Sequence, residues 1–169
     1  MTNRQRSLLI GAAQVALVAM LGAKLLLDRA RLPHGWAMVM AYDPELPIRG
    51  RYIRLTLVVP PVDSAASQLL KTTGWPQLRV VADRVMTGIG TGDAGQSVYT
   101  TALRGDSILV LRDPVAYFIP DQIADPSIRP AGEHLWAEVT VPRRGPPRPI
   151  RLGVSKGDGP IVPLLIAAQ

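Results

Sequence analysis

The chain carries few side chains of the types that usually perform catalysis near neutral pH. It has two histidines, His34 and His134, and no cysteine. A Ser-His-Asp triad would have to use His134, and no serine lies in the G-x-S-x-G pattern of many hydrolases. One domain histidine without cysteines does not supply the donors of a typical zinc site. The sequence therefore predicts no catalytic residue and no metal site, with carboxylate-bound Ca²⁺ around Gly157-Asp158-Gly159 as the remaining metal alternative.

A serine nucleophile with a lysine base is a second chemistry to test, because type I signal peptidases combine it with a membrane anchor and a β domain. Beyond the N-terminal apolar segment the lysines are Lys71 and Lys156. Ser64 and Ser67 lie so near Lys71 in sequence that a shared short helix at Ser64–Lys71, or a solvated loop, is favoured over a buried dyad.

Two further groups could indicate ligand chemistry. Gly90 to Gly95 fits G-x-G-x-x-G, but a dinucleotide site needs a helix after it. The following stretch Gln96–Thr101 is β-branched and aromatic, which predicts a strand, a hairpin loop and no cofactor. The carboxylates Asp121, Asp125 and Glu133 would favour an enzyme only if they converged in a cleft.

The positive charge is concentrated at the N-terminus. The net charge of the chain is +6, and residues 1–35 contribute +4 of it, while residues 36–169 contribute +2. Basic residues that flank an apolar segment contact lipid headgroups. The remainder is nearly balanced and has few aromatic residues for base stacking, so nucleic-acid binding is not predicted.

The apolar segment Ser7–Leu27 predicts a transmembrane helix. Its 21 residues would span about 31 Å as a helix, which matches the hydrocarbon core of a bilayer. Its one charged residue, Lys24, lies in the last turn, where its stem can reach the interface. The alternative is a signal peptide cleaved after Leu21-Gly22-Ala23, but apolar residues resume beyond that point. We therefore expect an N-terminal tail (1–6), an uncleaved transmembrane helix (7–27), a linker (28–35) and one mostly β extramembrane domain (36–169).

Beyond the linker, short stretches of alternating apolar and polar residues are separated by turn signals. Residues 51–59 show the pattern well, because Ile53, Leu55 and Leu57 would share one strand face. Short strands at roughly ten-residue spacing predict a mainly β fold, either a small sandwich or an open barrel. The strand candidates are Trp36–Tyr42, Arg51–Val59, Gln77–Met86, Ser97–Leu103, Ser107–Leu111, Val115–Ile119, His134–Val141, Pro149–Val154 and Ile161–Ala167. The turn candidates include Arg104-Gly105-Asp106, Arg144-Gly145-Pro146 and Gly157-Asp158-Gly159.

The start of the domain resembles the GDYXXLXY family of bacterial membrane-anchored proteins, whose pattern is roughly D-P-x-x-x-x-R-G-D-Y-x-x-L-x-Y. The matching residues are Asp43, Pro44, Arg49, Gly50, Tyr52 and Leu55. Arg51 stands where the family has Asp, and Leu57 stands where it has the final Tyr. A later stretch, Tyr117-Phe118-Ile119-Pro120-Asp121, resembles a Y-F-[VI]-P-E segment of the family.

We interpret these motif residues as structural. Asp43-Pro44 would form a turn, Gly50 would permit a positive φ, and Arg49 would pair with Asp43 or with a carbonyl. We expect Tyr117 and Phe118 to belong to the core. Arg51, Leu55 and Leu57 would share one strand face, so both departures from the family fall on that face.

The resemblance implies a small anchored domain without an established activity, often encoded near multi-pass membrane proteins. It thus implies a bacterial inner-membrane protein. Its short leading tail favours a cytoplasmic N-terminus and a periplasmic domain, although the flanking charges nearly balance. The predicted function is a non-enzymatic interaction module with a multi-pass membrane partner. One alternative is an anchored hydrolase or ligand-binding enzyme with an unrecognised site. A third interpretation, an envelope-stress or lipid sensor, rests on the basic flanks of the apolar segment.

Overall fold

The fold is taken from a computed structural model that describes residues 3–41, 51–64, 75–90, 95–103, 105–120 and 125–165. The chain divides into two compact units, Met1–Leu32 and Pro33–Gln169. Each unit has its own architecture, one helical and one β. The motif residues Asp43, Pro44, Arg49, Gly50 and Asp121 lie outside the described residues, as does most of the helix expected at Ser64–Lys71.

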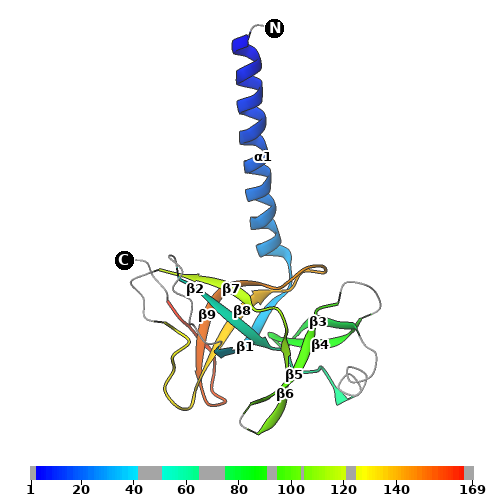
Figure 1. Cartoon of the computed structure of the whole chain (residues 1–169), viewed down its shortest axis with the longest axis vertical. Coiled ribbons are helices and arrows are strands. Elements are labelled where there is room, and N and C mark those ends of the chain that lie inside the picture. Colours follow the sequence, from blue (N-terminus) through cyan, green and yellow to red (C-terminus); the bar gives the residue numbers. More distant parts are fainter. Residues whose placement is uncertain are drawn as a thin grey trace. The chain divides into compact units, whose positions relative to one another are not determined.

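The first unit is a single helix, α1, which spans Asn3–Arg31 without interruption (Figure 1). Leucine and alanine dominate it, and both are strong helix formers. Arg29 and Arg31 occupy its last turn, where cations complement the helix dipole. Pro33, two residues after Arg31, cannot continue the helix. Within it, residues 5–31 form a helix long and apolar enough to span a membrane, with a mean hydropathy of 1.9.

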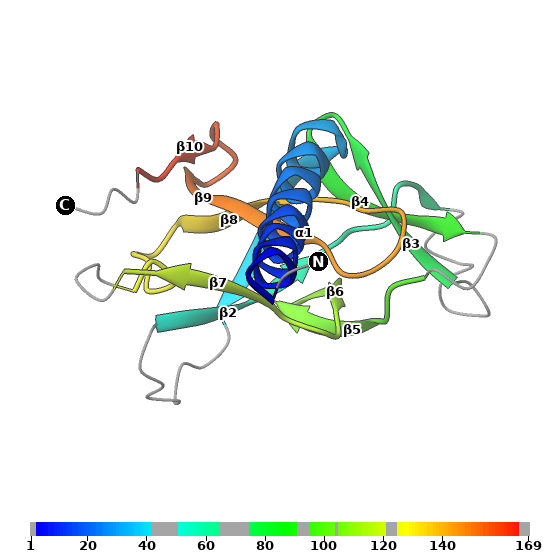
Figure 2. The same ribbon diagram turned by 90° about the horizontal axis from the view of Figure 1, so that it is seen from above.

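The second unit is built on β-strands, which form one sheet. The strands are β1 (His34–Ala41), β2 (Arg51–Val58), β3 (Trp75–Val81), β4 (Arg84–Gly90), β5 (Val98–Leu103), β6 (Asp106–Leu111), β7 (Val115–Ile119), β8 (Glu133–Thr140), β9 (Arg148–Lys156) and β10 (Val162–Pro163). The main order is β10-β9-β8-β1-β2-β6-β5, while β7 also pairs with β2, and the β3–β4 hairpin joins through β4 to β1. Figure 2 shows β7 beside β2 and the β3–β4 hairpin away from them.

All strand pairs are antiparallel except the short contact of β4 with β1. The strands β7, β2, β1, β8 and β9 are consecutive neighbours, and β7 also contacts β9 at the other end of this series. The sheet therefore curls around its own apolar face. The expectation of a mainly β fold after an N-terminal apolar helix is confirmed, and the strands form one open, largely antiparallel sheet.

The core lies on the concave side of this curled sheet. Ile53, Leu55 and Leu57 are buried in it, while Tyr52 and Arg54 on the same strand are exposed, as the alternation of β2 predicts. The remaining buried apolar residues of the core come from β1, β4, β6, β7, β8, β9 and their flanks: Ala37, Val39, Val59, Val85, Leu111, Val115, Ile119, Leu135, Ala137, Val139, Val141 and Leu152.

Two strand predictions are wrong. The single strand expected at Gln77–Met86 is a hairpin of β3 and β4, which reverses at Ala82 and Asp83 with φ of 47° and 59°. Positive φ at both turn positions suits the twist of a tight hairpin, although alanine rarely adopts it. The strand expected at Ile161–Ala167 is limited, among the described residues, to Val162–Pro163. The three turns expected from the sequence each contain a glycine with positive φ, namely Gly105, Gly145 and Gly157.

Candidate functional site

Two segments that are distant in sequence become neighbours in the sheet. β2 pairs with β7 in a register that places Tyr52 opposite Phe118, Ile53 opposite Tyr117 and Leu55 opposite Val115. The described residues of the two motif-like stretches are therefore adjacent. Pro120 follows the last residue of β7 and is half-buried.

On the outer face of these strands, Tyr52 and Phe118 form an exposed aromatic pair. Tyr52 is 65% exposed and Phe118 is 55% exposed. Their ring centroids are 5.4 Å apart and the ring planes meet at 65°, an edge-to-face arrangement that aromatic quadrupoles favour. Arg54 and Ala116, the next pair of opposed residues on this face, are also exposed. We call these four residues the aromatic surface.

The expectation that both Tyr117 and Phe118 belong to the core holds for Tyr117 alone. Tyr117 is half-buried and packs against the core, whereas Phe118 is exposed. The reason is the two-residue period of a strand, which directs adjacent side chains to opposite faces. Leu57, which stands where the resembled pattern has its final Tyr, is fully buried, as is Leu55.

A second aromatic group covers the outer face of β1, β8 and β9, and sequence reasoning missed it. The guanidinium of Arg84 stacks 4.0 Å from the centre of the Trp136 ring, and Trp136 Nε1 donates to Ser155 Oγ at 2.8 Å. The Arg151 guanidinium lies 5.5 Å from the Trp36 ring. The alternation His134, Trp136, Glu138 in β8 was the available sequence signal, since it puts these side chains on one face.

Glu138 is the buried charge of this group. It is 7% exposed, and its carboxylate forms an ion pair with the Arg151 side chain and lies 3.7 Å from His34 Nε2. The carboxylate is thus satisfied by a neighbouring strand. We infer a structural role for it, because burial of a carboxylate requires such partners.

Of the three carboxylates considered as a catalytic set, Asp125 and Glu133 have separate local partners, and Asp121 lies outside the described residues. Asp125 Oδ1 accepts a hydrogen bond of 2.8 Å from the Ser127 amide, which closes a turn. Glu133 pairs with Arg129 at 3.8 Å. Among the residues that the structure describes, no three His, Asp or Glu side chains are grouped as a metal ion would need.

The other candidate motifs are placed as follows. Gly90 ends β4, residues 91–94 lie outside the described part of the chain, and the next element is the strand β5, as predicted. β5 pairs with β6 and not with β4. The expected hairpin loop is therefore instead a connection between two strands that do not pair with each other. Ser64 and Lys156 are both exposed, and Ser67 and Lys71 lie in the part that is not described.

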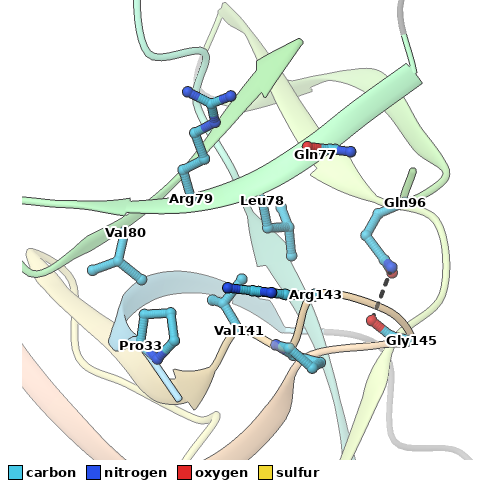
Figure 3. Close-up of a pocket in the computed structure, with 10 residues that line it drawn as sticks. Pro33, Gln77, Leu78, Arg79, Val80, Gln96, Val141, Arg143 and Gly145 are labelled. Carbon is cyan, nitrogen blue, oxygen red and sulfur yellow. Dashed lines mark hydrogen bonds between the residues drawn. The ribbon is translucent and has the colours of Figure 1, made fainter. Parts of the chain in front are cut away.

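A cavity of about 540 Å³ opens between β3 and the segment after β8. Leu78 and Val80 project into it from β3, and Val141 and Arg143 line the opposite side (Figure 3). At one end Gln96 Nε2 donates a 2.9 Å hydrogen bond to the Gly145 carbonyl (Figure 3). The volume is within the range of small-molecule sites, about 300–1,000 Å³. Sequence patterns did not indicate this cavity, because its walls come from four separate segments of the chain.

No protein-family model matches the chain, and comparisons with curated proteins and with solved structures give no match either.

Proposed function

We propose that the protein is a membrane-anchored, non-enzymatic interaction module of a bacterial inner membrane. In this proposal α1 is the anchor, the β unit is periplasmic, and the aromatic surface contacts a multi-pass membrane protein.

The exposed Tyr52–Phe118 pair is the observation that carries the proposal. Aromatic side chains are enriched at the centres of protein interfaces, where they bury a large area and lose little conformational entropy. The cross-strand contact already fixes the two rings relative to each other. A partner would therefore meet a preorganised apolar surface, which lowers the entropic cost of binding.

Two features support a partner inside the membrane. The motif-like stretches contribute the two exposed rings, and the resemblance implies multi-pass membrane proteins as neighbours. α1 contains two glycines, Gly11 and Gly22, and several alanines. Small residues in a transmembrane helix permit close approach of another helix.

The anchor part of the proposal predicts that the whole chain stays in membranes. The full-length protein should remain in the pellet after alkaline carbonate extraction and should keep its N-terminus, because the 27-residue apolar helix is long enough to span a bilayer. Membrane fractionation followed by N-terminal sequencing measures both. A mature N-terminus near Lys24 would contradict the anchor.

The interaction part is tested by chemical crosslinking in native membranes, followed by capture of the full chain in a mild detergent. The double variant Tyr52→Ala/Phe118→Ala should recover at least about tenfold less partner, because loss of interface aromatics costs about 2 kcal/mol or more. Tyr99→Ala is the matched control, since Tyr99 is also exposed, at 41%, but lies on β5 beside Arg112.

A second arm replaces Ser7–Leu27 by a polyleucine helix to separate the contribution of the anchor from that of the domain. Recovery should fall if α1 contributes a helix contact. Equal recovery by the wild type and the double variant, or substrate turnover by the domain alone, would refute the proposed function.

A further inference from the structure

The cavity beside β3 has both apolar and polar walls, and half of its lining residues are apolar. Leu78 and Val80 from β3 face Val141 and Pro142 across it, and Pro33 closes one side. Leu78 and Val80 also pack against the core, and the Pro33 carbonyl accepts a 2.8 Å hydrogen bond from the Val141 amide. These walls are therefore parts of the sheet and of its hydrogen-bonded margin. Such a surface suits the hydrocarbon part of a ligand.

One cation lies across the cavity. Figure 3 shows the Arg143 side chain between β3 and the segment 141–145. Arg79 also belongs to the lining, but Figure 3 shows its side chain directed away from Leu78 and Val80, on the other side of β3. No acidic residue lines the cavity, and within the described part of the chain Arg143 has no ion pair. A guanidinium in this setting has donors available for an anion, and phosphate matches their geometry well.

One end of the cavity is closed by hydrogen bonds of Gln96. Gln96 already donates its side-chain amide to Gly145, and its backbone amide donates to the Pro76 carbonyl at 2.7 Å. Gly145 has a φ of +87°, which glycine adopts without strain and which turns the segment toward Gln96. Arg143 therefore projects from a segment that is tied down on both sides.

The cavity is also close to the anchor along the chain. Pro33, one of its wall residues, comes two residues after Arg31, the last residue of α1. Two Cα–Cα steps extend at most about 7.6 Å. The relevance of this covalent link to lipid rests on the proposed function, in which α1 is inserted in a membrane.

We propose that this cavity binds a phosphate-bearing amphiphile, with the phosphate at Arg143 and the hydrocarbon part along Leu78, Val80 and Val141. An anionic membrane phospholipid and a soluble phosphate ester share the headgroup chemistry. The apolar walls and the adjacent anchor favour the phospholipid.

Native mass spectrometry of the full chain, released from a nonionic detergent with added phosphatidylglycerol or phosphatidylcholine, tests the proposal. We expect the wild type to retain phosphatidylglycerol and Arg143→Gln to retain it about tenfold less, because the variant loses the charge-assisted hydrogen bonds to phosphate. Arg144→Gln is the matched control, since Arg143 and Arg144 are both exposed and carry the same charge, but Arg144 does not line the cavity. The basic residues that flank α1 are unchanged in both variants, so lipid bound there gives the same background.

Calorimetric titration of the full chain with glycerol phosphate separates the two sources of the headgroup. Weak or absent binding of glycerol phosphate, together with the loss in Arg143→Gln alone, would support the amphiphile. Equal lipid retention in Arg143→Gln and the wild type, or equal losses in both variants, would overturn the site. Binding of glycerol phosphate as tight as that of the lipid would overturn the role of the apolar walls. None of these outcomes depends on Tyr52 or Phe118, so failure here is distinguishable from failure of the proposed protein contact.

Discussion

The outer face of the sheet carries two aromatic groups that differ in their partners. Trp36 and Trp136 are half-buried and lie against the guanidinium groups of Arg151 and Arg84, and Trp136 also donates a hydrogen bond to Ser155. Tyr52 and Phe118 are exposed, and their rings contact each other edge to face. The tryptophan group is built into the sheet, whereas the tyrosine–phenylalanine pair faces outward.

This difference separates stability from binding. Side chains with internal partners stabilise the fold, and their loss leaves cavities or unpaired polar groups. Exposed side chains without such partners contribute little to stability, so a large exposed aromatic pair is available to another molecule. The comparison therefore predicts opposite consequences for substitutions in the two regions. All four predictions below can be measured by urea unfolding of the full chain in a nonionic detergent, followed by tryptophan fluorescence.

The largest effect is expected beneath the aromatic surface. Leu55 is on the opposite face of β2 from Tyr52 and is fully buried. Leu55→Ala should lower the free energy of unfolding by about 3 kcal/mol, because it removes buried methyl groups and leaves a cavity. A loss below about 1 kcal/mol would contradict the assignment of this face to the core.

A smaller loss of stability is expected when Gly153, which lies against the Trp36 ring, is replaced. A Cβ there would lie 2.7 Å from Ile161 Cγ2 and 2.8 Å from the Trp36 ring, so both side chains would have to move. Gly153→Val should cost about 2 kcal/mol through overpacking. Ala116→Val on the exposed face of β7 adds comparable bulk and should be nearly neutral. Equal stabilities of the two variants would show that the Trp36 ring does not rest on Gly153.

The buried carboxylate of the same region should matter less. Glu138→Gln keeps the shape but weakens the pair with Arg151, whose side chain is half exposed and can be solvated. We expect a loss of about 1–2 kcal/mol, typical of a hydrogen bond to a charged group. Glu133→Gln is a suitable comparison, because Glu133 is more exposed and its pair with Arg129 is longer. A greater loss of unfolding free energy for Glu133→Gln than for Glu138→Gln would contradict the view that the buried pair matters more.

The smallest effect on stability is expected in the aromatic pair itself. Tyr52→Ala and Phe118→Ala should each cost less than about 1 kcal/mol, and a double-mutant cycle should give a coupling of about 0.5 kcal/mol, as for exposed cross-strand pairs. Losses comparable to that of Leu55→Ala would mean that the pair is structural, and the comparison of the two regions would fail.

Local patterns in the sequence predicted much of the fold but little of the candidate site. The alternation around Ile53 and Leu55 and the apolar run of α1 are local signals, and both predictions agree with the structure. The reversal at Ala82-Asp83 was missed because it contains no glycine or asparagine to mark a positive φ. The pairing of Tyr52 with Phe118 and the cavity at Arg143 join segments distant in sequence, and strand periodicity alone does not specify such contacts.

Site-specific photo-crosslinking in native membranes tests most directly whether the exposed pair is a binding surface. A photoreactive phenylalanine would replace Phe118 in one version of the full chain and Tyr99 in another, so that both probes are on exposed strands of the same domain. The proposed function predicts a crosslinked adduct with a multi-pass membrane protein from position 118 and none from position 99. No adduct from position 118, or the same adducts from both positions, would contradict it.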